Sequence, residues 1–465
     1  MSASRSLRLL LPALAGALLP ACGEGDRACA ERVVLVTCDT LRRDKLGVYG
    51  CERPTTPSLD AFAKECVVFD RAWSSAPLTS PALCTLMTGR LPDELGMSSN
   101  KVLLPAEATT IAEIVSAAGI QTHAIVSNWV LREREGADGV EQGFQTYDAR
   151  FDAVESNRPN VHERRATSTT DAAIAWLERE ARDRFFLWVH YQDPHGPYTP
   201  PAAFVDDAPL GDEPELPLGE KQVGHGELPE YQAIGAERRP GFYRARYEAE
   251  VRYFDHELGR LLAALERSGR LADTLVAFTA DHGESLGEHD YWFSHGQTVY
   301  SELVRVPLLV RYPAGAPRPA TTERGGYARS GELVSHYDLF PTVLAALGLR
   351  ARPSHGTSLL DQRFPADRVV PSHLRSPGAS GRWESLTDGR HQLVIHPRGA
   401  ELYDLETDPD GARDLAAERP ELVLSLKERA ERMTGHLPPV GAKALEEELT
   451  DEERAVLKKL GYFGE

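Results

Sequence analysis

The segment VVLVTCDT, residues 33–40, decides the fold. Its first five positions lack the alternation of a half-exposed strand, so 33–37 is predicted to be a strand buried on both faces. Two similar runs come later, FFLWVHY at 185–191 and TLVAFT at 274–279. Helical periods lie between these runs, and strands that alternate with helices predict an α/β fold with a doubly wound, mostly parallel sheet.

The rest of the chain divides around that sheet. Residues 30–350 are predicted to form the main α/β domain, in which a helical period at 243–265 is followed by Gly269 as an expected stop. The segment 197–240 is rich in proline and acidic residues, which predicts a lid-like surface insertion. Short alternating strands and turn pairs predict that 352–465 is a smaller C-terminal antiparallel α+β subdomain with a helical tail.

Residues 1–21 are typical of a bacterial lipoprotein signal. Arg5 and Arg8 precede an apolar run that is too short to span a bilayer, and LPAC at 19–22 closes the segment. We therefore expect a lipid anchor on Cys22 and an exported, membrane-anchored protein in the periplasm or on the cell surface. The alternative is a buried N-terminal helix, which the prolines in this segment disfavour.

The composition excludes other classes of protein. Hydrophobic residues make up 42% of the chain and charged residues 26%, which is typical of a globular protein. A net charge of -18 repels phosphate backbones, so no nucleic acid partner is expected. Cleavage before a lipidated Cys22 would leave five other cysteines, an odd number whose pairing the sequence does not define.

Polar residues follow each of the three buried runs. They are Cys38-Asp39-Thr40, Asp193-Pro194-His195 and Asp281-His282. In open α/β sheets, ligands bind beyond the carboxyl ends of the strands, so we expect these groups to meet. Asp39, Asp281 and His282 offer two hard oxygens and one imidazole, which suits one divalent cation: Ca²⁺, Mg²⁺ or Mn²⁺. A turn or helix-cap role is the alternative for each carboxylate taken alone.

The segment SAPLTSPALCTLMTGR, residues 75–90, offers a candidate nucleophile. Ser80 suits a helix N-cap, Pro81 the first turn and Gly89 the stop, so Thr79 is expected just outside a helix N-terminus. An anion bound there would meet free backbone N–H groups and the positive end of the helix dipole, and a cation could lower the pKa of the hydroxyl. Simple capping is the alternative.

In their order along the chain, these motifs resemble the sulfatase family of the alkaline phosphatase superfamily. The matching segments are 39–50, 55–60, 79–90, 185–198, 280–307, 336–342 and 401–409. The resemblance implies an ester hydrolase with one divalent cation and a small-molecule, glycan or lipid ester of sulfate or phosphate as substrate. It also implies these roles: Thr79, His195 and His295 catalytic, Asn128 substrate-binding, and Asp39, Thr40, Asp281 and His282 metal-binding.

The chain departs from the family's pattern at several positions, and it is identified with a subgroup that has Thr as the nucleophile. The family's formylglycine forms from Cys or Ser with Pro two residues on and Arg four residues on, whereas Thr79 is followed by Pro81 and Leu83. Threonine cannot become formylglycine, so none is expected. Thr40 stands where the family has a second acidic ligand, and Ser127-Asn128-Trp129 stands where many members have Lys-x-His.

The threonine favours phosphate over sulfate esters. A threonine sulfate would be a stable, trapped ester, whereas a phosphothreonine can be attacked again at phosphorus with the help of a metal. The sequence therefore predicts an exported, metal-dependent hydrolase that leans toward phosphoryl transfer through Thr79. The alternative is a lipid-anchored binding protein that kept the fold and lost turnover, which Leu83, Thr40 and the missing Lys-x-His pair favour.

Overall fold

The computed structural model describes residues 28–133, 139–155, 158–207, 210–219, 224–375, 381–434, 437–440 and 443–444. The predicted signal at 1–21, the anchor at Cys22 and residues 445–465 of the predicted tail lie outside the described residues. In the part of the chain that is described, no helix is long and apolar enough to cross a bilayer. The five cysteines described there are free thiols.

A nine-stranded sheet forms the centre of the molecule. Its strands are β1 (Arg32–Cys38), β2 (Val67–Trp73), β4 (Gln121–Val126), β5 (Thr146–Asp148), β8 (Phe185–Tyr191), β9 (Thr274–Ala280), β12 (Leu308–Arg311), β13 (Thr322–Arg324) and β14 (Tyr327–Ser335). Their order is β13-β14-β2-β12-β9-β1-β8-β4-β5. β12 and β13 run antiparallel to their neighbours and the other pairs are parallel, which confirms the predicted fold class.

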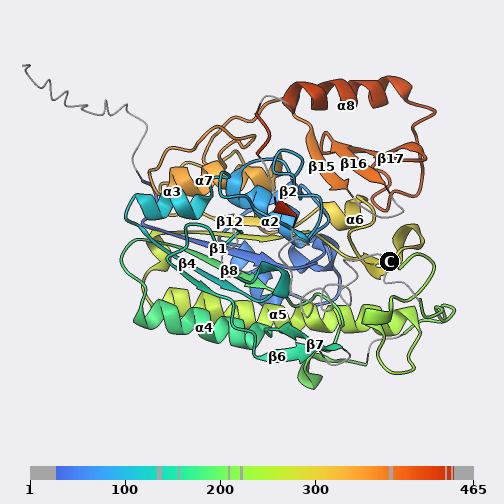
Figure 1. The fold of residues 1–465 in the computed structure, drawn as a ribbon, viewed down its shortest axis with the longest axis horizontal. Helices are drawn as coiled ribbons and strands as arrows, with labels where there is room; N and C mark the ends of the chain where they lie inside the picture. The colour runs from blue at the N-terminus through green and yellow to red at the C-terminus, as the bar shows by residue number, and fades with distance from the viewer. Residues whose placement is uncertain are drawn as a thin grey trace, which may run out of the picture.

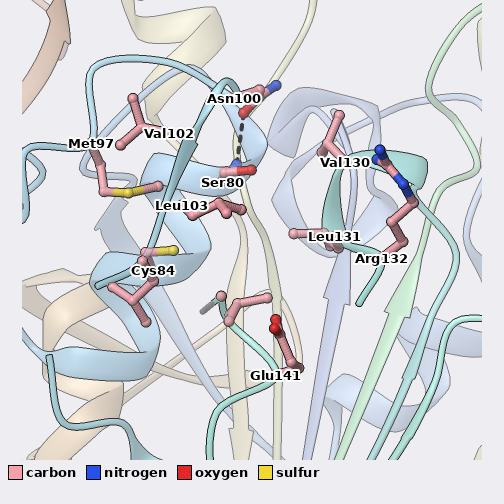
Figure 2. Close-up of a pocket in the computed structure, with 13 residues that line it drawn as sticks. Ser80, Cys84, Met97, Asn100, Val102, Leu103, Val130, Leu131, Arg132 and Glu141 are labelled. Atoms are coloured by element: carbon pink, nitrogen blue, oxygen red, sulfur yellow. Dashed lines mark hydrogen bonds between the residues drawn. The ribbon is translucent and has the colours of Figure 1, made fainter. Parts of the chain in front are cut away.

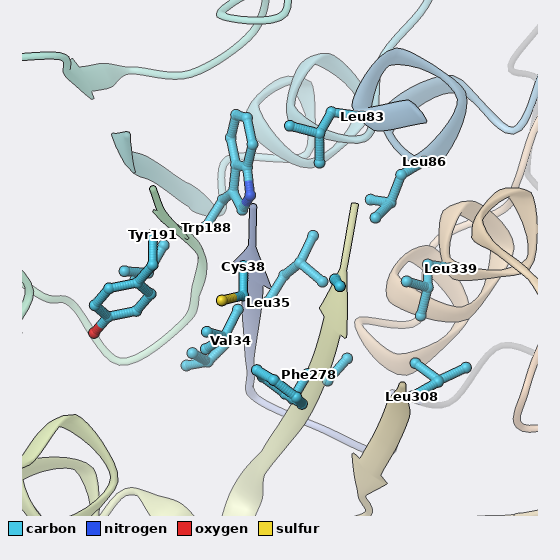
Figure 3. Packing of buried hydrophobic residues seen from close by; sticks show 14 of the residues in the cluster. Val34, Leu35, Cys38, Leu83, Leu86, Trp188, Tyr191, Phe278, Leu308 and Leu339 are labelled. Atoms are coloured by element: carbon cyan, nitrogen blue, oxygen red, sulfur yellow. The ribbon is translucent and has the colours of Figure 1, made fainter. Parts of the chain in front are cut away.

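Helices cover both faces of this sheet. The helices are α1 (Pro57–Ala63), α2 (Thr79–Thr88), α3 (Ile111–Ala117), α4 (Ala166–Arg179), α5 (Pro240–Arg267), α6 (Ser301–Val304) and α7 (Leu339–Ala346). α4 and α5 lie along one face, and α2, α3 and α7 lie over the other (Figure 1). Leu83 and Leu86 of α2 point toward the strands and belong, with Leu339 of α7, to the main buried core (Figure 3).

The C-terminal subdomain is a four-stranded antiparallel sheet with a helix packed on it (Figure 1). Its elements are β15 (Val370–Arg375), β16 (Arg382–Thr387), β17 (His391–His396), β18 (Gly399–Asp404) and α8 (Pro420–Met433).

Smaller strands elsewhere in the chain form two-stranded sheets. They pair as β3 (Val102–Leu103) with β19 (Lys443–Ala444), β6 (Ala153–Glu155) with β7 (Arg158–Glu163), and β10 (Ser285–Leu286) with β11 (Trp292–Ser294).

The buried runs form strands as predicted, with ends that shift by one residue at most. The helical period at 243–265 lies inside α5, and Gly269 follows it with a φ of 70°, a left-handed conformation that glycine adopts readily. In the described part of 197–240, regular structure before α5 is limited to two short 3-10 helices, η4 (Ala202–Phe204) and η5 (Glu230–Gln232). The lid role of this segment stays a prediction.

Candidate active site

Three neighbouring strands end in polar residues at one edge of the sheet. β9, β1 and β8 lie side by side, and Asp39 and Asp281 directly follow β1 and β9. Backbone bonds tie these ends together, because Asp39 N donates to Tyr191 O at 2.9 Å and Asp281 N donates to Cys38 O at 3.2 Å. The buried strands therefore bring the two carboxylates to one place.

The predicted metal ligands Asp39, Asp281 and His282 converge. His282 Nε2 lies 3.8 Å from Asp39 Oδ1 and 3.7 Å from Asp281 Oδ2. All three side chains are fully buried. His282 Nδ1 lies 2.8 Å from Gly283 O, and a carbonyl oxygen can only accept, so Nδ1 carries the proton and Nε2 faces the carboxylates with its lone pair.

His190 on β8 joins this group, and sequence reasoning misses it. Its Nε2 lies 3.8 Å from Asp39 Oδ2. One ligand atom from each of Asp39, His190 and Asp281 lies within 4.8 Å of the other two. The signal in the sequence is a histidine inside a run that is otherwise apolar or aromatic, because a buried imidazole needs polar partners.

The geometry of the donor atoms fits a cation. Four buried donor atoms have no hydrogen-bond partner among the described residues: Asp39 Oδ1, Asp281 Oδ2, His282 Nε2 and His190 Nε2. Leaving such atoms unpaired costs free energy, so each one calls for a bound group. Carboxylate oxygens and imidazole nitrogens in one buried cluster are ligands that divalent metal ions accept.

Burial and charge separate the two carboxylates. Burial alone would raise the pKa of Asp39, but the neighbouring histidines, of which His195 acts most strongly, hold that pKa well below its usual range. Burial, and then the charge of Asp39, raise the pKa of Asp281 well above its usual range. Two carboxylates at this separation repel each other, and a cation between them would remove that repulsion.

Asn128 and Thr40 both contact these carboxylates. Asn128 Nδ2 donates to Asp39 Oδ2 at 2.5 Å, and its Oδ1 accepts from Val130 N at 2.9 Å, so the amide is oriented at both ends. Thr40 N donates to Asp281 Oδ1 at 3.2 Å, while Thr40 Oγ1 is buried without a partner among the described residues. The structure brings both residues to the site. Substrate binding by Asn128 and metal binding by Thr40 stay predictions.

The two predicted catalytic histidines adjoin the candidate metal ligands. The His295 ring centroid lies 4.6 Å from that of His282 and 5.2 Å from that of His195. His295 Nδ1 lies 3.0 Å from Glu284 Oε1, and Glu284 Oε2 accepts from the Tyr198 hydroxyl at 3.1 Å. Glu284 is a second site residue that sequence reasoning misses, although it lies two residues after His282.

Burial tunes this histidine and glutamate pair. It raises the pKa of Glu284 to about 7 and lowers the pKa of His295 to about 3. The His295 imidazole is therefore neutral near pH 7, and Glu284 holds its Nδ1 side. This leaves His295 Nε2 as the nitrogen that can act on a bound ligand.

Thr79 is the first residue of α2, and its buried hydroxyl has no partner among the described residues. The N-cap is Leu78, so the predicted cap at Ser80, with Thr79 just outside the helix, is wrong. Ser80 N is instead bound by a distant side chain, because it donates to Asn100 Oδ1 at 2.8 Å (Figure 2). The predicted stop at Gly89 is confirmed as a left-handed C-cap.

Contacts with other elements place the start of α2. Gly296 follows His295, and a Cβ built on Gly296 would stand only 2.6 Å from Leu78 Cδ2. α2 also packs against the 3-10 helix η3 (Trp129–Leu131), which begins directly after Asn128. The residue before Thr79 thus lies against the residue after His295, at the edge of the sheet that carries the candidate ligands.

Two residues of α2 that a formylglycine motif would bring into play, Leu83 and Cys84, are buried. Leu83, where a formylglycine motif would have Arg, is fully buried in the main core (Figure 3). Burial raises the pKa of the Cys84 thiol far above its usual value, so this thiol is a poor nucleophile. A pocket beside α2 is lined by Ser80, Cys84 and Asn100 among others and includes none of the predicted site residues (Figure 2).

Comparison with known proteins gives one consistent result. The model of the sulfatase family matches residues 31–349 of this chain. The chain is 29% identical over 306 residues to an ulvan-active sulfatase of Formosa agariphila, a match that covers 62% of this chain and 57% of that protein. It is 27% identical over 412 residues to a choline-sulfatase of Rhizobium meliloti, with 77% of each chain covered.

Solved structures have the same fold. A phosphonate monoester hydrolase of Agrobacterium radiobacter matches with a TM-score of 0.68 at 20% identity, covering 88% of this chain and 95% of that chain. A structure solved with its substrate D-glucosamine-2-N,6-O-disulfate matches with a TM-score of 0.69 at 20% identity, covering 86% and 97%.

Proposed function

We propose that this chain, which belongs to the sulfatase family and is an ester hydrolase of that family, is a metal-dependent enzyme. Its nucleophile would be Thr79, and it would prefer phosphate esters to sulfate esters. One observation carries the proposal. Thr79 is the first residue of α2, it is fully buried, and its hydroxyl has no hydrogen-bond partner among the described residues. A hydroxyl so placed suits attack better than structural capping, because capping would pair it with a backbone N–H group.

The residues of the site would have three roles: binding the cation, binding the transferred group and contacting the leaving oxygen. Asp39, Asp281 and His282 would hold one divalent cation, which supplies charge stabilisation and lowers the pKa of a bound hydroxyl. Ser80 N is already bound by Asn100 and Pro81 has no N–H, so the Thr79 N–H and the positive end of the α2 dipole would stabilise the oxygens of the transferred group. His295 and His195 would both contact the leaving oxygen, and Nε2 is the His295 nitrogen left to do so because Glu284 occupies the Nδ1 side.

The choice of phosphate follows from the chemistry of threonine. Attack by Thr79 Oγ on phosphorus breaks the bond to the leaving oxygen and forms a phosphothreonine, which water can then attack at phosphorus. The same attack on sulfur would leave a threonine sulfate without an easy second step. The buried Leu83, in the place of the Arg of a formylglycine motif, supports an unmodified threonine.

Substrate and location are parts of the same proposal. Relatives are named for ulvan, for choline sulfate and for phosphonate monoesters, so the family fold accommodates both polymeric and small esters. We propose a small-molecule, glycan or lipid ester as substrate, with the 197–240 segment over the site as its selector. An exported protein held at a membrane by lipid on Cys22 would act on esters outside the cytoplasm.

The test is a substrate panel with matched variants. Thr79→Ala should lower kcat on p-nitrophenyl phosphate by about 10³-fold or more, while Thr79→Ser should keep part of the activity because it keeps the hydroxyl. The control is Thr85→Ala, a buried threonine of the same helix whose hydroxyl also has no partner among the described residues; it should stay near wild type. Equal activity of Thr79→Ala and wild type, or faster wild-type hydrolysis of sulfates than of phosphates, would overturn the proposal.

A further inference from the structure

We propose that His190 is the fourth protein ligand of the cation and that it makes the site select a transition-metal ion such as Zn²⁺ over Mg²⁺ and Ca²⁺. The inference rests on the metal site of the proposed function. It gives His190 a ligand role that the family resemblance does not assign, and it names the class of metal.

The position of the imidazole carries the first step. His190 is the second-last residue of β8 and is fully buried. Its Nε2 lies 3.8 Å from Asp39 Oδ2, and donor atoms of Asp39, His190 and Asp281 lie within 4.8 Å of one another. These separations exceed hydrogen-bond length but suit ligands that surround one ion at about 2 Å each. His190 Nε2 has no hydrogen-bond partner among the described residues.

The far side of the ring is already oriented for metal binding. His190 Nδ1 lies 2.9 Å from Thr37 Oγ1, and that hydroxyl also accepts from Trp188 Nε1 at 2.9 Å. In the metal-bound form, Nδ1 carries the proton and donates it to Thr37, which turns the Nε2 lone pair toward Asp39. Metal-binding histidines are usually held by such a hydrogen bond on the other ring nitrogen.

The composition of the site carries the second step. Thr40 stands where the family has an acidic ligand, so this chain has a neutral hydroxyl in place of one carboxylate. With His190 the remaining set is two carboxylates and two imidazoles: Asp39, Asp281, His282 and His190. Imidazole nitrogens favour Zn²⁺ and similar ions, whereas Mg²⁺ and Ca²⁺ prefer oxygen ligands throughout.

Another buried histidine of the same sheet provides the comparison. His123, on β4, also contacts a threonine hydroxyl, that of Thr146, through Nδ1. Its ring stacks on Trp176 with centroids 4.7 Å apart, and it belongs to no candidate metal cluster among the described residues. Burial lowers its pKa to about 4. His123 therefore serves as a matched control: a buried histidine with a similar hydroxyl contact and no acidic cluster.

The experiment measures cation binding and not turnover. Titration calorimetry of the metal-free full chain with Zn²⁺, Mg²⁺ and Ca²⁺ should show preference for Zn²⁺. His190→Phe should weaken Zn²⁺ binding by more than about 100-fold, which exceeds the usual loss when only a hydrogen-bond partner of a metal ligand is removed. It should change Mg²⁺ binding little. His123→Phe should leave all three affinities within about 3-fold of wild type, and thermal unfolding checks that both variants fold.

A second measurement needs no variant. In Cu²⁺-loaded wild type, electron spin-echo modulation from the remote imidazole nitrogens should report two bound histidines. A count of one histidine, or unchanged Zn²⁺ affinity in His190→Phe, would overturn this inference and leave the Thr79 hydrolase proposal standing. Failure of wild type to bind any divalent cation would overturn both.

Discussion

Thr79 is the residue on which the proposed chemistry depends. Cysteine or serine at this position can be oxidised to an aldehyde, whereas the methyl group of threonine blocks that reaction. The surroundings agree with the substitution, because Leu83 fills the core where a motif arginine would stand. The carboxylates and histidines of the site remain, so under the proposed function this residue would change which ester can complete a catalytic cycle.

Asn128 is the residue where a contact beyond the ligands can be tested. Its amide donates to Asp39 Oδ2 and accepts from Val130 N, so it orients the carboxylate of a candidate metal ligand. Asn128→Leu should weaken metal binding by about 10- to 100-fold, measured by calorimetry. Asn100→Ala removes an amide that binds only the Ser80 backbone among the described contacts and should leave metal affinity unchanged. Equal affinities for wild type and Asn128→Leu would contradict this role.

At the scale of elements, the central strands were predictable and the nucleophile helix less so. Nearly continuous apolar runs mark the bounds of β1, β8 and β9, because a strand buried on both faces is apolar on both sides and the first polar residues after it mark its end. The start of α2 was misplaced by one residue, since Ser80 looks like a cap while its N–H is bound by Asn100 from outside the helix. A long-range partner of this kind leaves no local pattern in the sequence.

The histidines show the same division between local and long-range information. His282 follows a carboxylate at a strand end and was predictable from that motif. His190 stands out as a histidine in an otherwise apolar or aromatic strand, but its contact with Asp39 depends on how β8 pairs with β1. Pairing of strands about 150 residues apart is set by the whole fold.

Asp255 of α5 controls the docking of α1 and gives a pH-dependent prediction. It accepts from Ser58 N at 2.9 Å and Leu59 N at 2.8 Å, and burial raises its pKa from 3.8 to about 6. The Asp255 carboxyl therefore binds its proton more tightly in the folded protein than in the unfolded chain. Its stabilising effect is complete below pH 3.8 and is lost as pH rises through about 6.

Asp255→Asn should therefore remove a pH dependence. Lowering the pH from 7 to 4 should stabilise wild type relative to this variant by up to about 3 kcal/mol, measured by urea unfolding. The exposed Asp171→Asn on α4 is the control and should keep a constant difference from wild type. A constant difference for Asp255→Asn over the same range would refute the raised pKa.

At the scale of the whole molecule, the C-terminal subdomain supports the approach to Thr79. Ser372 of β15 donates to Ser74 O at 2.5 Å, and His373 N donates to Ser75 O at 2.8 Å. These serines lie a few residues before Thr79, so the small sheet holds the segment that leads into α2. We therefore expect changes in this sheet to affect the position of Thr79.

Ser372→Ala tests this support. Loss of the bond to the buried Ser74 carbonyl should lower the free energy of unfolding by about 1 to 2 kcal/mol and reduce kcat while KM changes little. Ser385→Ala is the control, because that hydroxyl accepts from Gln392 within the small sheet. It should lose stability without a matching loss of kcat. If both variants lose kcat along with stability, the loss of kcat is a general result of destabilisation and the specific support of the segment before Thr79 is refuted.

The measurement that tests the central claim most directly is trapping of the covalent intermediate. Wild type mixed with a phosphate monoester and quenched rapidly in acid should yield, by peptide mass spectrometry, one phosphoryl group on Thr79. Thr79→Ala should yield none, and a sulfate ester should leave a sulfated Thr79 that persists after the substrate is exhausted. An oxidised residue beside the metal ligands, or phosphate turnover without modification of Thr79, would contradict the account.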